Sequence, residues 1–598
     1  MIAFREWNSV ARRRATRTLT LLCGAGLLLT SCAPASTSNS QAPTGTNGQS
    51  AGSAPASRGT KTINMGMQLQ EEPVGRGSST GIINITGPGT TGNSGGTEHR
   101  LMFHAGLTIF DDHNVLQPHI AQQVPNLNDG SWKVNDDGTM ELTWKLKPNV
   151  FWHDGTPLTA SDFVFGTTVA RDGEFVANPP AVGTRQLSDV LAPDPQTLLV
   201  HFATPFVGAN LGDNTPALPG HILKETYDRG DKNGLQNSTY WTTDFVGLGP
   251  YKVGHWVLGS FLEGMAFDQY FLGRPKIDRV ILRYYGDANT MVASLLAGDL
   301  DILPAGAQLD TRPLSTIRQS WGTSGGTVLP IPKGTRNFIP QQRDQTQPWV
   351  RDPGVRQAIA LILDKQLIVD TLQDGATTPA YTSITPAIPA FQRLEQLSPR
   401  KWQYDPVQAA RLLTDAGWTK GTDGAYRNAA GQQLGFDVTS SGQPKNVQEI
   451  EAIAAQYSVF GMQVAPTPYP ASASNASEIR MTFKGFLVWP ASSFTSALEG
   501  FSSSSIGTEQ NRYRGSNYGG YSNPEYDRLY GEYAVTLDPQ KSQDLVAQMM
   551  KVVADDVGAI PLYYVALGVA FRTGLVGPGG AAPDQPANAW NINTWDLQ

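Results

Sequence analysis

The sequence predicts an α/β protein built from more than one lobe, and three observations lead to this prediction. The chain has 598 residues, which at roughly 150 residues per domain corresponds to about three or four folded units. Charged residues make up only 16%, while Gly (62) and Pro (41) are plentiful, a composition typical of a globular protein rich in turns. Segments with strand periodicity alternate with segments of helix periodicity along the body of the chain.

Residues 1–31 are predicted to be an export signal. Four arginines between positions 12 and 17 form a positive start, and the run 19–30 that follows is uncharged and mostly apolar. This run is too short to span a bilayer, which takes about 20 helical residues, but it suits a secretion signal. Leu-Thr-Ser-Cys at 29–32 resembles a bacterial lipobox, which implies cleavage before Cys32 and a lipid on its thiol. A chance cysteine beside an ordinary cleavage site is the alternative.

Residues 32–60 are predicted to be a lipidated flexible linker. Positions 33–60 contain no Leu, Ile, Val or aromatic residue, and Arg58 is their only charge, so they cannot bury enough apolar surface to fold. Because residues 1–31 hold five Arg and one Glu, loss of the signal changes the formal net charge from −7 to −11. An acidic protein of this kind is not expected to bind nucleic acid.

The body contains several elements whose boundaries follow from local chemistry. Apolar and polar side chains alternate over 140–147, which predicts a half-buried strand. Thr159 followed by Asp162 predicts a capping box at the start of a helix. Three further helices are predicted to begin with an aspartate N-cap followed by proline; these aspartates are Asp352, Asp405 and Asp538.

Two glycine motifs suggest enzymes, but their surroundings do not. Residues 87–92 match G-x-G-x-x-G, yet Asn-Ser-Gly-Gly follows where a dinucleotide site needs a helix. Residues 322–326 match G-x-S-x-G around Ser324, but extended chain follows where a hydrolase has a helix. No H-E-x-x-H motif is present, and His153 is expected to cap a turn. We expect no catalytic residue, metal or cofactor, with a secreted hydrolase as the remote alternative.

Residues 483–521 differ from the rest of the body in composition. They are short of aliphatic side chains and rich in Ser, Gly, Phe and Tyr. Trp489, Arg512 and Tyr518 lie within them. Two interpretations are open: a long surface loop, or a polar and aromatic loop that contacts a ligand.

Seven sequence blocks carry a resemblance to a known family. They are HAGLTIFDDHNVLQPHIAQQVP (104–125), WKLKPNVFWHDGTPLTASDFVF (144–165), GLGPYKVGHW (247–256), AGDLDI (297–302), DPGVRQAIALILDKQLIV (352–369), YDPVQAARLLTDAGW (404–418) and YSNPEYDRLY (521–530). In this order they resemble the extracellular solute-binding proteins of family 5, the peptide and nickel-type receptors of ABC importers. The resemblance covers about residues 62–580.

The resemblance implies a two-lobed periplasmic-binding-protein type II fold with an additional domain and a hinge between the lobes. The implied boundaries are 62–106, 238–325 and 561–598 for a discontinuous lobe I, 107–237 for the extra domain and 326–560 for lobe II. It also implies a monomeric substrate-binding lipoprotein, exported to the periplasm or cell surface and anchored to the outer face of the cytoplasmic membrane. Such a receptor encloses a solute by hinge closure and delivers it to an ABC permease and ATPase complex.

The family resemblance does not decide which ligand is bound. In peptide-binding relatives, an aspartate in a Trp-rich loop of the second lobe pairs with the peptide amino terminus, but the corresponding residues 485–494 contain no acid. A peptide is expected first on family frequency, an oligosaccharide is the alternative, and other ligands, including metal chelates and opines, are also open. A chaperone or signalling receptor that uses the same cleft is a third class. The expected ligand-binding residues are Trp489, Ser492, Ser493, Phe494, Arg512 and Tyr518, with Glu72 (or Glu71) from the first lobe.

Overall fold

The structure is a computed structural model, and its compact unit is Gly59–Gln598. It describes residues 59–68, 94–172, 182–257, 259–309, 311–322, 324–470, 473, 477–490, 498–582, 584–585 and 587–598. The predicted signal, most of the predicted linker and the motif at 87–92 lie outside the described residues.

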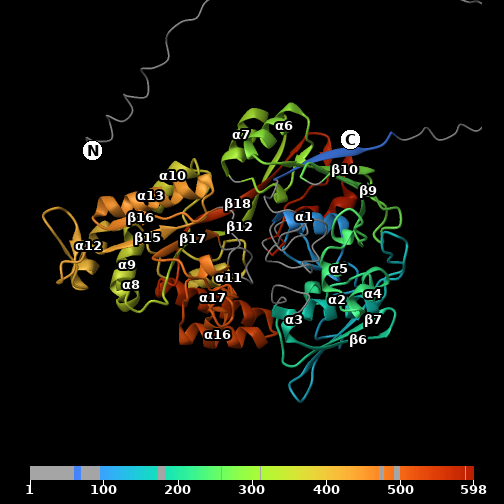
Figure 1. Ribbon diagram of the computed structural model, residues 1–598, viewed down its shortest axis with the longest axis horizontal. Helices are drawn as coiled ribbons and strands as arrows, with labels where there is room; N and C mark the ends of the chain where they lie inside the picture. The colour runs from blue at the N-terminus through green and yellow to red at the C-terminus, as the bar shows by residue number, and fades with distance from the viewer. Residues whose placement is uncertain are drawn as a thin grey trace, which may run out of the picture. The chain divides into compact units, whose positions relative to one another are not determined.

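A ten-stranded sheet runs through this unit (Figure 1). Its order is β16 (Gln463–Pro466), β15 (Gly435–Thr439), β17 (Phe486–Pro490), β12 (Gly326–Pro340), β18 (Ile560–Arg572), β11 (Ile302–Leu303), β1 (Thr62–Gln68), β10 (Arg279–Tyr285), β9 (Phe261–Ala266) and β8 (Tyr251–Val257). Strands β12 and β18 are antiparallel and pair from Gly326 opposite Arg572 to Phe338 opposite Ile560. They are much longer than their neighbours in the sheet.

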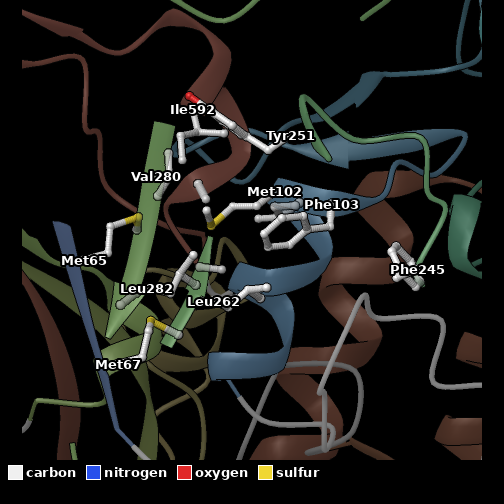
Figure 2. Close-up of a cluster of buried hydrophobic side chains, with 14 of the residues drawn as sticks. Met65, Met67, Met102, Phe103, Phe245, Tyr251, Leu262, Val280, Leu282 and Ile592 are labelled. Atoms are coloured by element: carbon white, nitrogen blue, oxygen red, sulfur yellow. The ribbon is translucent and has the colours of Figure 1, made fainter. Parts of the chain in front are cut away.

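These two long strands connect two separate hydrophobic cores. Ile331 and Val569 belong to the first core, whereas Phe338 and Leu562 belong to the second. In the first core, strand β1 runs parallel to β10, and its alternate side chains at positions 63, 65 and 67 are buried. Figure 2 shows Met102 and Phe103, at the end of helix α1 (Ser94–Phe103), beside β10 and its buried side chains. Chain segments far apart in sequence therefore share each core.

Three helices begin where the aspartate N-caps predict: two belong to the second core, and the third packs in a further core of its own part of the chain. Asp352, Asp405 and Asp538 accept hydrogen bonds from the backbone N–H groups of the second or third residue of the helices α9 (Pro353–Ile362), α12 (Pro406–Asp415) and α17 (Pro539–Asp555). These predictions are confirmed. Other helices of this part of the chain are α8 (Pro348–Arg351), α10 (Lys365–Leu372), α11 (Ala390–Gln396), α13 (Pro444–Phe460), α14 (Ser477–Met481) and α16 (Pro524–Val535).

A third core lies under a separate four-stranded sheet. Its order is β4 (Trp132–Val134), β5 (Met140–Lys145), β7 (Thr197–Phe202) and β6 (Leu187–Asp194). The predicted strand is confirmed as β5, with Met140, Leu142 and Trp144 buried. The capping box of Thr159 and Asp162 is also confirmed, at the start of α2 (Ala160–Arg171).

His153 connects two distant segments, whereas the sequence predicts only a cap for its own turn. The side chain is buried, with Nδ1 accepting from Gly247 N at 3.1 Å and Nε2 lying 3.0 Å from the Gly249 carbonyl oxygen. These partners are 94 and 96 residues further along the chain. A sequence window around His153 contains no information about partners so far away.

The remaining elements are short or peripheral. They are β2 (Thr108–Phe110), β3 (Leu116–Pro118), α3 (Val182–Gln186), α4 (Gly220–Asp228), α5 (Lys232–Gln236), α6 (Ala288–Ala297), α7 (Thr311–Trp321), β13 (Thr419–Lys420), β14 (Tyr426–Arg427), β19 (Leu575–Val576) and β20 (Asp596–Leu597). Among the helices of the described residues, none carries the apolar run that spanning a bilayer requires.

Candidate functional site

The candidate site lies where three neighbouring strands end. Strand β15 is parallel to both β16 and β17, and the three strands end at Thr439, Pro466 and Pro490. Loops that follow the carboxyl ends of parallel strands lie together at one edge of the sheet, which is where open α/β sheets bind ligands. The residues around this edge are therefore the first place to look for a solute.

Two aromatic rings and a guanidinium meet at this edge. The ring of Trp489, on β17, lies 5.8 Å from the ring of Tyr518 in an edge-to-face arrangement. The Arg480 guanidinium, on α14, lies 5.4 Å from both ring centroids, close enough for a cation–π attraction. All three side chains are half-buried, so each keeps part of its surface accessible to solvent.

Tyr469 completes this group from the loop after β16. Its backbone N–H donates to the Ser440 carbonyl at 3.0 Å, and its carbonyl accepts from Gly442 N at 2.7 Å. Its ring packs in the same apolar cluster as Trp489 and Tyr518. The residue is only 7% exposed, and its hydroxyl has no hydrogen-bond partner among the described residues. We refer to Tyr469, Arg480, Trp489 and Tyr518 as the aromatic wall.

The hydroxyl of Tyr469 remains protonated near neutral pH. Burial raises its pKa to about 12, although the nearby charges of Arg480 and Arg336 act in the opposite direction. A protonated phenol can donate one hydrogen bond. Tyr469 therefore offers a donor that no group in the described part of the chain uses.

Polar side chains hold the loops beneath the aromatic wall. The Ser440 hydroxyl donates to the Val488 carbonyl at 2.9 Å, which ties the end of β15 to β17. Asn446 Nδ2 donates to Ser441 Oγ at 2.6 Å. Because these side chains already have hydrogen-bond partners within the protein, they hold the loops in place. Contacts with a ligand are then left to the aromatic wall.

A buried ion pair lies close to the same edge. Arg336, on β12, is paired with Glu449, on α13, at 2.5 Å, and the two side chains are 9% and 5% exposed. Arg336 also donates to Asn446 Oδ1 at 2.9 Å, and the Tyr563 hydroxyl donates to Glu449 at 2.8 Å. Burial alone would lower the pKa of Arg336, but the Glu449 carboxylate outweighs it and raises the pKa. The charge of Arg336 is therefore matched within the protein.

The structure brings some of the expected ligand-binding residues together and separates another. Trp489 and Tyr518 are in contact. Arg512 is exposed on a turn with φ of 57°, and no ring or ion-pair contact joins it to that pair within the described part of the chain. Ser492, Ser493, Phe494 and Glu72 (with Glu71) lie outside the described residues.

Within 483–521, the surface-loop interpretation is wrong for one part. Residues Phe486, Leu487 and Val488 are fully buried in β17, and they anchor Trp489 at the end of that strand. The sequence-based site also missed four residues that lie at this edge, which come from four different segments: Tyr469, Arg480, Arg336 and Glu449. No local motif marks any of them.

A pocket of about 430 Å³ lies near the aromatic wall. Its lining includes Gln342, Arg343, Met481, Glu509 and Tyr513. The Arg343 guanidinium donates to the carbonyls of Met481 at 2.9 Å and Tyr518 at 2.7 Å. Arg343 therefore connects the pocket to the backbone of Tyr518 in the aromatic wall.

Neither the acidic cluster at 111–113 nor the exposed Ser324 forms a site like the aromatic wall. Asp111, Asp112 and His113 bring ligand atoms within 4.8 Å of one another, but the Asp111 carboxylate accepts the N–H groups of His113 and Val115 in a hairpin turn. Ser324 is exposed between α7 and β12. This helix-to-strand connection has the opposite order to that of a nucleophile elbow.

Comparison with known proteins gives consistent relatives. The family profile described as bacterial extracellular solute-binding proteins, family 5, middle part, matches residues 122–511. The oligopeptide-binding protein AppA of Bacillus subtilis (strain 168) is 24% identical over 507 residues, which is 84% of this chain and 87% of AppA.

Solved structures align over nearly the whole described unit. AppA in complex with a nonapeptide has a TM-score of 0.70 and 22% identity, covering 90% of this chain and 99% of AppA. The oligopeptide-binding protein of Thermus thermophilus with a pentapeptide has a TM-score of 0.72 and 21% identity, covering 90% and 96%. NikZ of Campylobacter jejuni with Ni(L-His) has a TM-score of 0.70 and 20% identity, covering 90% and 99%.

These neighbours are two-lobed proteins of the periplasmic-binding-protein type II fold, and the chain shares that fold. The profile match extends over more than half of the sequence. The chain therefore belongs to family 5 of the bacterial extracellular solute-binding proteins.

Proposed function

We propose that this protein is the substrate-binding lipoprotein of an ABC importer, and that its solute is a peptide. The observation that supports this most is the aromatic wall, which lies at the carboxyl edge of β15, β16 and β17 in a family 5 fold. Two relatives of the same fold bind a nonapeptide and a pentapeptide. Half-buried rings provide apolar contact area at low entropy cost, which suits a receptor for ligands of varied side chains.

The proposed binding mode uses residues from both lobes. Trp489 and Tyr518 contact the ligand from one side, together with Ser492, Ser493 and Phe494, which follow Trp489 in the sequence. Glu72 contributes from the first lobe, and Arg512 adds a charge at the rim. Ligand binding then needs to favour the closed state over the open state by only a few kcal/mol. The docked permease reopens the receptor and takes the solute.

The export and anchoring proposal rests on the sequence. A cleaved signal at 1–31 and a lipid on Cys32 hold the monomeric receptor on the outer face of the cytoplasmic membrane, at the cell surface or in the periplasm. Replacing Cys32 by alanine should move the protein from the membrane fraction to the soluble fraction. A Cys32→Ala variant that stays in the membrane fraction would contradict the lipid anchor.

No chemistry on the ligand is proposed. The receptor needs to release its solute unchanged, and the exposed Ser324 stands in a helix-to-strand turn. Ligand recovered after release should have the same mass as ligand supplied. Turnover that is lost on Ser324→Ala would instead support a hydrolase.

An oligosaccharide is the second candidate ligand, because Trp489 and Tyr518 form a ring surface and residues 485–494 lack an acidic partner for an ammonium group. Thermal-shift measurements on the purified protein distinguish the two candidates. Pools of di- to hexapeptides should raise the melting temperature, and β-linked oligosaccharides of similar size should not. A shift with the sugars alone would end the peptide proposal.

A further inference from the structure

We infer that a small contact between the loop after strand β7 and the connection between helices α16 and α17 stabilises the closed form of the receptor before any solute is bound. Its two apolar residues are Val207, in the loop, and Leu537, in the connection. We refer to this contact as the latch. The inference rests on the proposed function, because it concerns the hinge closure by which such a receptor encloses its solute.

Residues 341–559 build cores of their own. The chain enters this part through β12 and leaves it through β18. Besides the second core, it contains a fourth core, in which Leu498, Tyr526 and Leu545 are buried. Because β12 is irregular between Pro332 and Gly334, a bend of the two long strands would move both cores together relative to the first core.

The predicted extra domain, 107–237, is attached firmly to the first core. Phe165, Val169 and Leu218 from this segment are buried in the same cluster as Met65 and Val280. Protein interiors are close-packed and do not slide freely. We therefore expect the extra domain and the first core to move as one body.

The latch joins the extra domain to residues 341–559 in a different way. The Val207 N–H donates to the Ala534 carbonyl at 2.9 Å, in the last turn of α16, where helix carbonyls have no partner within the helix. Val207 packs against the fourth core and Leu537 against the third core, and both residues are half-buried. The two cores remain separate clusters, and each receives one side chain from the other part of the chain.

An ion pair lies beside the latch. Arg185, on α3, is 3.4 Å from Glu499, and the two side chains are 43% and 23% exposed. Figure 1 shows α3 and α16 next to each other at this place. The charges of Glu499 and Arg185 both act on the hydroxyl of Tyr530, on α16. Exposed ion pairs contribute little to stability, so this pair adds orientation to the contact and little strength.

A contact of this construction can form and break. The Val207 N–H and the Ala534 carbonyl can each bind water when they separate, and the two apolar side chains are half-buried. A small contact is sufficient to change how often a two-state protein is closed, because a modest difference in free energy shifts the two populations strongly. The latch therefore suits a receptor that closes and is reopened by a permease.

Pulsed EPR distances between spin labels test the inference without any ligand. The chain contains only Cys23 and Cys32 as cysteines, so full-length protein with Cys23→Ala and Cys32→Ala is labelled only at introduced cysteines. Leu191→Cys and Val459→Cys, at positions 44% and 88% exposed, report the distance between the extra domain and residues 341–559. Leu191→Cys with Met265→Cys, at a position 39% exposed, reports the distance between the extra domain and strand β9.

Leu537→Asp places a charge against the third core and should open the latch. The distance between labels at 191 and 459 should lengthen, and the distance between labels at 191 and 265 should stay the same. Val207→Asp tests the contact from the other side and should give the same result. Leu397→Asp, at a leucine that is 39% exposed in residues 341–559, is the matched control and should change neither distance.

Melting temperatures show whether each variant is folded. If an aspartate variant does not fold, the alanine variant at the same position replaces it and should give a smaller shift in the same direction. An unchanged distance between 191 and 459 in the folded latch variants would overturn the inference. Equal changes in both label pairs would also overturn it, because the extra domain would then have moved away from the first core.

A peptide pool separates this inference from the peptide proposal. Di- to hexapeptides added to Leu537→Asp should restore the short distance, because a ligand that binds the closed form shifts the population towards it. Their affinity for Leu537→Asp should be about tenfold weaker than for wild type. Equal affinities would overturn the latch and leave the peptide receptor in place. If the pool does not bind wild type, the peptide proposal fails, and the distances without ligand still decide the latch.

Discussion

The hydroxyl of Tyr563 donates to the Glu449 carboxylate at 2.8 Å, and this bond joins strand β18 to helix α13. The same carboxylate is paired with Arg336, which lies opposite Tyr563 in the β12–β18 register. Strand β12 is irregular between Pro332 and Gly334 and again directly after Arg336. The ion pair therefore fixes α13 to the two strands that connect the cores, at a point where one of them bends.

The first prediction is that Glu449→Gln strongly destabilises the protein. It leaves the Arg336 guanidinium buried without a counter-charge, and loss of one partner of a buried pair costs about 3–5 kcal/mol. Urea unfolding measures the change. Glu451→Gln, on the exposed side of the same helix, is the control and should stay within about 0.5 kcal/mol. Equal stability of the two variants would show that the pair contributes little.

The second prediction concerns stability in acid. Burial lowers the pKa of His104 and His119 to about 3 and that of His153 to about 4. Because the unfolded chain takes up these protons near pH 6.5 and the folded protein does not, stability is complete above pH 6.5 and falls as the pH drops towards 4. Each histidine contributes up to about 1.4 kcal/mol per pH unit in this window.

Thermal unfolding between about pH 7.5 and 4.5 tests this prediction. His104→Phe keeps a ring next to Trp152 and Phe245, which both lie near His104, and it should reduce the loss of stability in acid. His255→Phe, on an exposed histidine, should leave the pH dependence unchanged. An identical acid profile for wild type and His104→Phe would contradict the prediction.

The third prediction concerns Glu98, whose titration changes stability with pH in the direction opposite to that of the histidines. Burial raises the pKa of Glu98 to about 7, although N–H groups of Asn588, Gly306 and Ala589 donate to its carboxylate and act against the shift. The folded state therefore holds a proton that the unfolded chain releases near pH 4.5, and this contribution to stability is lost as the pH rises from about 4.5 through 7.

Comparison of Glu98→Gln with wild type isolates that contribution. The difference in melting temperature between them should change steadily from about pH 4.5 to 7.5, with the variant gaining relative to wild type as the pH rises. Glu225→Gln, whose side chain is 85% exposed, should show a constant difference. A constant difference for Glu98→Gln as well would mean that folding does not raise the pKa of Glu98.

Local chemistry in the sequence was sufficient for the ends of several helices. An aspartate before a proline satisfies the first free N–H groups of a helix wherever the helix lies in the fold, and Asp352, Asp405 and Asp538 all do so. The alternation over 140–147 likewise reflects a strand with one buried face, as β5 has. Predictions of this kind hold because each rests on neighbours within one turn or one strand.

The candidate site was only partly accessible to the same reasoning. Trp489 and Tyr518 stood out by composition, but Tyr469 and Arg480 join them only because β15 pairs in parallel with β16 and β17. Parallel pairing brings together residues that are far apart in sequence, and local windows do not show it. The Arg336–Glu449 pair spans 113 residues and escaped prediction for the same reason.

The fourth prediction explains one of the family sequence blocks. Gly249 lies in the Gly-Leu-Gly-Pro-Tyr stretch, and a Cβ there would lie 2.5 Å from both the His104 N and the Met102 O atoms. Because both neighbours are backbone atoms, the segment would have to shift, and overpacking of this kind costs about 1–3 kcal/mol or more. Gly249→Ala should lower the midpoint of urea unfolding, whereas Gly286→Ala, with no neighbour within 4 Å, should not. Equal midpoints of urea unfolding for the two variants would mean that the chain around Gly249 shifts without loss of stability.

The last prediction tests whether the aromatic wall contacts the solute. Trp489→Ala removes both a ring beside Tyr518 and the surface over which the Arg480 guanidinium lies. An aromatic contact contributes about 0.5–1.5 kcal/mol beyond area burial, so affinity for any bound peptide should fall about tenfold. Trp489→Phe keeps a smaller ring and should lose much less. Calorimetric titration measures both variants against wild type, with the melting temperature of each protein confirming that it is folded. Unchanged affinity in Trp489→Ala would remove this residue from the ligand site and leave the pocket beside Arg343 as the place to search.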